Sequence, residues 1–329
     1  MQVKAADARA SLFMKEGIRL MQSDNDAEAA LLYFDRALQL RRRLPIEAPI
    51  HAYGLAACWL NRAEALTRLG ADHTLTLCAY DEALALLRPL PLGDDARFSK
   101  RLAIAHQNRA LVLAAQNPPR TEHAIAALVD AIAVLDHADA MEAPERDYLL
   151  AVVWMNLANI HSSEDTVVSG AAALEAARQA LALVNPREYL VNPREYEDAA
   201  AAEAGLKARH LLCRIAARRL SVRAESETVM TEVHDATDLA EEVLTLVREW
   251  ERRGVDHFRD LASDLFRFAA RVYAGYQPHF LQEFLSEQLD PRQSAHHYVH
   301  SREMQDAAQE IVLLLHASSG DRNKASRRI

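Results

Sequence analysis

The chain has 329 residues, of which 50% are hydrophobic and 26% are charged, and its formal net charge is −9. Its 9 glycines and 11 prolines are too few for an all-β sandwich or barrel, which needs a turn roughly every 8–12 residues. The negative net charge disfavours binding to nucleic acid that depends mainly on electrostatic attraction to the phosphates. No apolar stretch approaches the roughly 18 residues of a membrane-spanning helix, and the first residues lack a secretory signal pattern.

Cysteine usage indicates the compartment. The three cysteines, Cys58, Cys78 and Cys213, are irregularly spaced, which fits a reducing environment and offers no zinc-binding framework. We therefore expect a cytoplasmic protein that has no cofactor and no membrane contact.

Two motifs recur along the N-terminal half. The first begins at Trp59, His106 and Trp154, so its copies start 47 and 48 residues apart. The second is centred on four alanines that are 46, 48 and 49 residues apart: Ala37, Ala83, Ala131 and Ala180. Two motifs that stay in phase over this length indicate an internal structural repeat.

Each repeat is predicted to form two helices. In the second repeat, apolar residues at helical spacing cover 50–69 and 74–87, and Gly70 between them is a candidate helix stop. The third repeat turns at Asn117, Pro118 and Pro119. A single hairpin cannot bury its apolar faces, so the hairpins should stack on one another as a solenoid.

The order of large and small residues narrows the kind of solenoid. The first helices carry large, small and large residues in turn: Phe13/Gly17/Leu20, Trp59/Ala63/Leu66, His106/Ala110/Leu113 and Trp154/Ala158/His161. The second helices carry the complementary order: Ala30/Phe34/Ala37, Thr76/Tyr80/Ala83, Ala124/Leu128/Ala131 and Ala173/Ala177/Ala180. Small residues let two helix backbones approach closely, and large residues fill the space beside them.

This pattern resembles the tetratricopeptide repeat (TPR). The resemblance implies an all-α fold: a right-handed α-solenoid of stacked antiparallel helix hairpins. The period of about 47 residues exceeds the usual 34 or so, which indicates elongated helices and would also suit HEAT repeats.

The repeat phase weakens after residue 186. We expect four TPR-like hairpins over 1–186, a loop and a fifth, degenerate hairpin over 187–254, capping helices over 255–317 and a basic tail over 318–329. The heptad at 183–189 is repeated verbatim at 190–196, which should lengthen that loop. Aromatic residues concentrate in the cap and should seal the last hairpin: Phe258, Phe266, Phe268, Tyr273, Phe280 and Phe284.

No phosphate-binding loop, nucleophile elbow or zinc-protease motif occurs, so we expect a protein that is not an enzyme. The TPR resemblance implies an interaction scaffold that binds a peptide or partner helix in a concave groove. Asn61, Asn108 and Asn156 hold the same position in three consecutive first helices. Asparagine disfavours helix by up to about 0.7 kcal/mol relative to alanine, so its recurrence indicates a compensating interaction. That interaction is either with a bound partner in the groove or with a neighbouring helix that the asparagine helps to hold in the stack. The predicted groove residues are Lys15, Asn61, Glu64, Asn108, Asn156 and Asn159.

Two other functions stay open. His296 and His300 would share one face of a helix and are weak metal-ligand candidates, which would suit a metal-dependent enzyme or sensor. An RNA-binding helical repeat protein is the other alternative. The net charge disfavours it, and such a protein would need a basic residue in the same phase of every repeat, with aromatic residues interleaved.

Arginine occurs at one repeat position where leucine is usual. Arg62 and Arg109 should pair with a carboxylate of a neighbouring repeat, and Glu82 and Asp130 are the candidate partners. The alternative is that these arginines bind the carboxylate of a ligand. The run Arg41–Arg43 falls at a predicted helix end, where cations complement the helix dipole.

Overall fold

The computed structural model describes residues 2–164, 166–184, 196–222, 227–252, 259–276 and 278–289, together with 306, 309 and 311. Over this part of the chain the regular structure is helical, with no strand. Its elements are α1 (Gln2–Arg19), η1 (Leu20–Asp24), α2 (Ala27–Arg41), α3 (Pro49–Arg68), α4 (His73–Leu87), α5 (Ala96–Ala114), α6 (Thr121–Asp136), α7 (Ala143–Ser162), α8 (Val167–Leu183), α10 (Tyr196–Val222), α11 (Glu227–Arg252), α12 (Arg259–Tyr276) and α13 (Pro278–Leu289).

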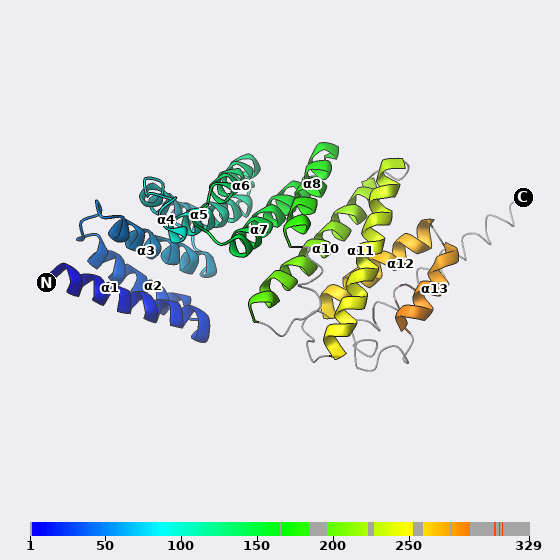
Figure 1. The fold of residues 1–329 in the computed structure, drawn as a ribbon, viewed down its shortest axis with the longest axis horizontal. Helices are drawn as coiled ribbons and strands as arrows, with labels where there is room; N and C mark the ends of the chain where they lie inside the picture. Colours follow the sequence, from blue (N-terminus) through cyan, green and yellow to red (C-terminus); the bar gives the residue numbers. More distant parts are fainter. Residues whose placement is uncertain are drawn as a thin grey trace, which may run out of the picture. The chain divides into compact units, whose positions relative to one another are not determined.

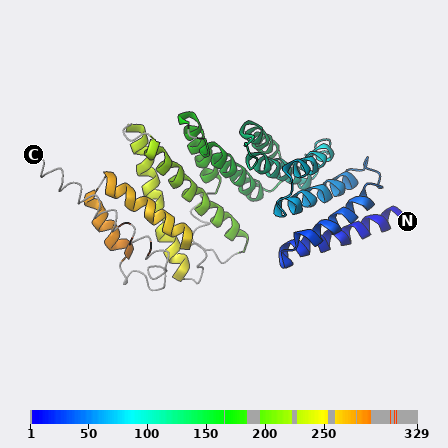
Figure 2. The same ribbon diagram turned by 180° about the vertical axis from the view of Figure 1, so that it is seen from behind.

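The chain divides into two compact units, residues 1–163 and 164–329. In the first unit, α1–α2, α3–α4 and α5–α6 form antiparallel hairpins, and each helix from α2 to α7 packs on the one before it (Figures 1 and 2). This confirms the predicted all-α solenoid of stacked hairpins. The boundary between the units falls between α7 and α8, the two helices of the fourth predicted hairpin, so the division of the chain at 186 stays a prediction.

Side-chain caps and one glycine define the helix ends. Asp26, Asp72 and Asp95 each precede a helix and accept a backbone N–H of its first turn, at 2.9, 2.7 and 2.9 Å. Gly70 follows α3 with φ +62°, and the next amide, of Ala71, donates to the Leu66 carbonyl at 3.0 Å. This is a Schellman stop, as the sequence predicts for Gly70.

The alternation of small and large residues packs the helices of each hairpin. Gly17 on α1 lies against Phe34 of α2, and a Cβ at Gly17 would lie 2.5 Å from the nearest ring carbon. Phe34 is fully buried, as are Ala30 and Ala37 on either side of it along α2. The predicted pattern therefore corresponds to real contacts in the first hairpin.

The basic run at the end of α2 contacts both α1, in the same hairpin, and α3, in the next one. The Arg41 guanidinium donates to Ser11 Oγ at 3.0 Å and lies 3.5 Å from a carboxylate oxygen of Asp7, both on α1. Arg42 stacks over the Trp59 ring of α3, 4.9 Å from its centroid. The structure thus adds side-chain packing to the helix-dipole role expected from sequence.

The second unit contains α8 and α10 to α13, in which each described helix packs on its neighbour in the chain. Phe266, Phe268 and Phe284 are buried in its core, and the Phe266 and Phe284 rings stack with centroids 5.6 Å apart. This confirms that cap aromatics close the apolar core. Phe280 is 45% exposed and does not share that role, and Phe258 lies outside the described residues.

Candidate functional site

The six predicted groove residues lie on the first helices of the hairpins or on α7. Lys15 is on α1, Asn61 and Glu64 are on α3, Asn108 is on α5, and α7 carries Asn156 and Asn159. Of these six, Glu64 and Asn108 come together in one pocket of the first unit.

This pocket, which we call the α3–α5 pocket, has a volume of about 540 Å³ and lies between the C-terminal halves of α3 and α5 and the start of α4. Volumes of this order are typical of ligand sites. Its lining residues are Glu64, Thr67, Arg68, Gly70, Ala71, His73, Thr76, Tyr80, Asn108, Leu111, Val112 and Ala115.

Two opposite charges lie at one side of the α3–α5 pocket. An Arg68 guanidinium nitrogen lies 2.8 Å from a Glu64 carboxylate oxygen, one helical turn away on α3. Arg68 also donates to the Met21 carbonyl at 2.8 Å, which holds its side chain against η1. Because these charges compensate each other, this side of the pocket presents polar groups without a net charge.

Tyr80 supplies a hydroxyl that the sequence analysis missed. Its side chain is 2% exposed, and burial raises the pKa of the phenol to about 12, against the opposing effect of hydrogen bonds with the Thr67 and Asn108 side chains. The phenol therefore stays protonated at neutral pH. Sequence patterning identified Tyr80 as a large packing residue, which it is, but gave no signal for the position of its hydroxyl.

Comparisons with known proteins bear on the fold. No protein-family model matches the sequence, and no curated protein matches it. The structure is similar to a crystal structure described as a putative kinesin light chain of Podosopora anserina with nearly identical TPR-like repeats. The two share 15% sequence identity at a TM-score of 0.51, and the match covers 75% of this chain and 98% of the other. The chain has a TPR-like fold.

The repeated asparagines of this TPR-like fold differ in their surroundings. Asn61 donates from its amide nitrogen to the Ala57 carbonyl of its own helix at 2.8 Å. Asn108 instead lies near the hydroxyl of the buried Tyr80 of the preceding hairpin, and both residues line the α3–α5 pocket. Asn156 is half-buried, whereas Asn159 and Lys15 are exposed. Asn108 is thus the repeated asparagine that lines this pocket.

The predicted arginine pairs exist, but the predicted partners were wrong. Arg62 Nε lies 2.8 Å from Asp35 Oδ1, and Arg109 Nε lies 2.7 Å from Asp81 Oδ1. Each pair joins a first helix to the second helix of the preceding hairpin. Glu82 and Asp130 sit one residue further along the repeat, which rotates their side chains by about 100° around the helix axis.

His106 fills the position that tryptophan holds in two other repeats of the TPR-like fold. Its side chain is 4% exposed, and Nδ1 lies 3.6 Å from an Asp130 carboxylate oxygen. Burial lowers the pKa of the imidazole to about 4, and the Asp130 charge opposes this effect only in part. A neutral His106 therefore acts as a core residue at neutral pH.

The metal-ligand candidates His296 and His300 lie outside the described residues. Within the described ranges, no group of three or more histidine, cysteine or acidic side chains is arranged to hold a metal ion. The described helices also include none long and apolar enough to cross a membrane.

Proposed function

We propose that this protein is a non-catalytic scaffold that binds an extended peptide segment of a protein partner in the α3–α5 pocket. A TPR-like repeat fold supports an interaction role in general. The observation that carries the finer proposal is that Glu64 and Asn108, predicted from repeat phase as ligand contacts, line one pocket together.

The chemistry of the pocket suits a peptide backbone beside an apolar side chain. A carboxamide offers both donors and acceptors, and the Asn108 amide lies next to the protonated Tyr80 hydroxyl. Leu111 is 42% exposed at the same pocket and provides an apolar contact surface. Neighbouring helices pack about 8–10 Å apart, close to the length of three extended residues at about 3.3 Å each.

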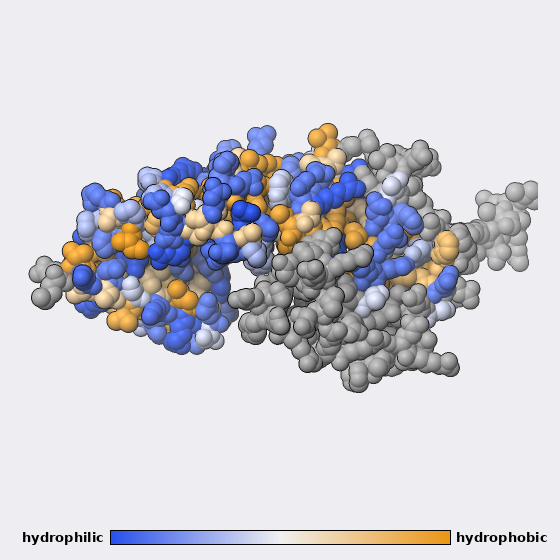
Figure 3. Space-filling model, viewed as in Figure 1, coloured by the Kyte–Doolittle hydropathy of each residue, from blue (hydrophilic) through white to orange (hydrophobic). Residues whose placement is uncertain are grey.

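The lining of the α3–α5 pocket is mixed, with polar residues such as Glu64, Arg68 and Asn108 beside the apolar Leu111 and Val112. On the face of the first unit that Figure 3 shows, the surface is largely hydrophilic, with separate hydrophobic side chains between the polar ones. A polar rim around a few apolar contacts is typical of reversible protein–protein interfaces. All three cysteines are free thiols, which supports placing this interaction in the reducing cytoplasm.

The test is a selection of linear peptides from a displayed random library on the full chain, followed by affinity measurement of the best binder. Leu111→Ala should weaken binding about fivefold or more, because it removes an apolar contact inside the pocket. Leu12→Ala is the matched control, since Leu12 is 65% exposed on α1 and does not line the pocket. Failure to select any peptide, or equal losses in both variants, would contradict the proposal.

A further inference from the structure

A second pocket of the first unit lies between α5, the C-terminal half of α6 and the segment that follows α4. Its volume is about 510 Å³, within the roughly 300–1,000 Å³ of small-molecule sites. We call it the α5–α6 pocket. It shares no lining residue with the α3–α5 pocket, so a ligand here would be separate from the proposed peptide.

Part of the α5–α6 pocket is apolar. Leu102 on α5 is 3% exposed, and it lines the pocket together with Leu92, Ala133 and Val134. Leu92 and Val134 are half-buried, which leaves part of each side chain open to a ligand. This part of the lining can therefore accept a hydrocarbon group.

Two opposite charges line the same pocket without forming an ion pair with each other. Arg88 follows α4, Asp130 lies on α6, and both are exposed. In the described part of the chain, Asp130 has its ion-pair contact with His106, where Oδ2 and Nδ1 are 3.6 Å apart, and no carboxylate lies within ion-pair distance of Arg88. With the lining histidines neutral, the pocket offers one cation and one anion as separate binding groups.

The buried His106 lies near both charges. Burial lowers the pKa of its imidazole to about 4; the Asp130 charge opposes this effect and the Arg88 charge adds to it. The other lining histidine, His137, has Nδ1 2.8 Å from the Ala133 carbonyl. The neutral His106 adds no further charge, so Arg88 and Asp130 dominate the electrostatics of the pocket.

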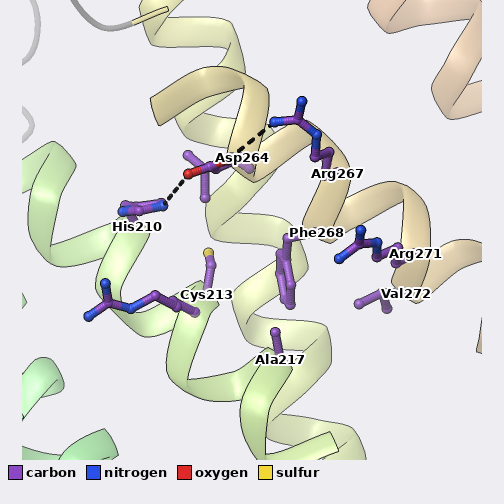
Figure 4. Close-up of a pocket in the computed structure, with 10 residues that line it drawn as sticks. His210, Cys213, Ala217, Asp264, Arg267, Phe268, Arg271 and Val272 are labelled. Carbon is purple, nitrogen blue, oxygen red and sulfur yellow. Dashed lines mark hydrogen bonds and ion pairs between the residues drawn. The ribbon is translucent and has the colours of Figure 1, made fainter. Parts of the chain in front are cut away.

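The second unit contains a pocket of similar volume, about 520 Å³, in which the charges are already engaged. Its carboxylate, Asp264, lies 3.3 Å from Arg267 Nη1 and 3.7 Å from His210 Nε2 (Figure 4). Arg214 and Arg271, which also line it, have interaction partners as well. A charged ligand there would have to displace existing contacts, which is not required at Arg88 in the α5–α6 pocket.

We propose that the α5–α6 pocket binds a free α-amino acid with an apolar side chain. The ligand carboxylate lies at Arg88, because a guanidinium can bind a carboxylate through two parallel hydrogen bonds. The ligand ammonium lies at Asp130, and its side chain lies over Leu102 and Val134. This proposal does not rest on the peptide in the α3–α5 pocket and adds a small-molecule ligand to the proposed scaffold.

Calorimetric titration of the full chain with three probes tests the two charged contacts. L-Leucine carries both charges, N-acetyl-L-leucine lacks the ammonium, and L-leucinamide lacks the carboxylate. We expect leucine to bind at least fivefold more tightly than either analogue, because a hydrogen bond between two charged groups is stronger than one that involves a neutral group. Glycine keeps both charges but has no side chain, and it should bind at least threefold more weakly than leucine.

Two substitutions assign the contacts to residues. Arg88→Gln should remove the preference for leucine over leucinamide and keep the preference over N-acetyl-leucine, whereas Asp130→Asn should have the opposite effect. Arg120→Gln and Glu122→Gln are the matched controls, because both residues are exposed at the start of α6 and neither lines the pocket. These controls should keep both preferences.

Leucine that fails to bind at millimolar concentration would overturn the proposal, as would equal binding of the three leucine probes. Preferences that survive both Arg88→Gln and Asp130→Asn would place leucine at another site and overturn it too. If the substituted chains do not fold, the comparison of the probes on the wild-type chain decides.

Discussion

At the scale of single residues, small side chains determine how closely paired helices approach. Gly17 lies against the Phe34 ring so tightly that a Cβ would sit 2.5 to 3.0 Å from three of its carbons. Gly170 on α8 has room, because its nearest neighbours would be Arg219 side-chain atoms at 3.6 and 3.8 Å. The contact with Phe34 therefore leaves no room for a larger residue at Gly17, whereas position 170 has room for an alanine.

This contrast predicts opposite effects of one substitution. Gly17→Ala should lower the free energy of unfolding by about 1–3 kcal/mol, because the buried Phe34 ring has to move. Gly170→Ala should raise it by about 0.5–1 kcal/mol, since alanine is the better helix former and meets only ordinary contacts. Denaturant unfolding of both variants checks the pair. Equal effects would contradict the packing described for α1 and α2.

Burial of His106 predicts a pH dependence of stability. The pKa falls from 6.5 to about 4 on folding, so between these values the unfolded chain binds more protons than the folded one. The contribution of the neutral His106 to the free energy of unfolding is fully present above about pH 6.5. It is lost as the pH falls toward 4, and the total loss is about 3 kcal/mol at most. His106→Gln should reduce the fall in melting temperature between about pH 7.5 and pH 5, whereas the exposed His123→Gln should not.

At the scale of elements, ion pairs connect successive hairpins at one repeat position. Arg62–Asp35 and Arg109–Asp81 each link a first helix to the preceding second helix. At the corresponding positions, the fourth repeat carries Leu157 on α7 and the preceding, third repeat carries Val129 on α6. The interface between hairpins therefore tolerates either an ion pair or two apolar residues.

A double-mutant cycle tests this assignment. The coupling energy between Arg109 and Asp81 should be about 0.2–1 kcal/mol, the range for partly exposed pairs, and should fall with added salt. The cycle between Arg109 and Glu82 should give a coupling near zero, since Glu82 is not the partner. Thermal or denaturant unfolding of the alanine variants provides both values, and a larger coupling to Glu82 would refute the observed pairing.

The spacing of the repeated motifs predicted the packing residues and one helix stop correctly, but it assigned the wrong carboxylate partners to the arginines. Both outcomes have a physical cause. Gly17, Phe34 and Gly70 were identified because a close helix contact and a left-handed stop admit few residue types. The carboxylate partners were misassigned because Asp81 and Glu82 are equally plausible by type, and only the helix rotation decides which one faces Arg109. The packing of α10 on α12 in the second unit gave no sequence signal, because the repeat phase fades before α10.

At the scale of the whole molecule, the C-terminal helices are part of the fold of the second unit. The inner face of α12 is fully buried at Leu265 and Phe266, in one core with Val243 and Leu244 of α11. This core would be open to solvent without α12. Cap helices are needed for solubility when a repeat stack would otherwise end on an apolar face.

A chain shortened after residue 253 should therefore aggregate or melt without cooperativity. The reason is that removal of α12 and α13 exposes a contiguous apolar surface on α11. Size-exclusion chromatography and calorimetry of the shortened chain check this expectation. A monomeric product with a cooperative transition would show that α12 and α13 are dispensable for the core.

The proposed function requires a partner peptide to occupy the α3–α5 pocket. Site-specific photo-crosslinking with the selected peptide tests this occupancy, with p-benzoylphenylalanine in place of Ala115 at the pocket or in place of Leu12 on α1. We expect a crosslinked product from position 115 and none from position 12. Equal crosslinking from both positions, or crosslinking from position 12 alone, would contradict it.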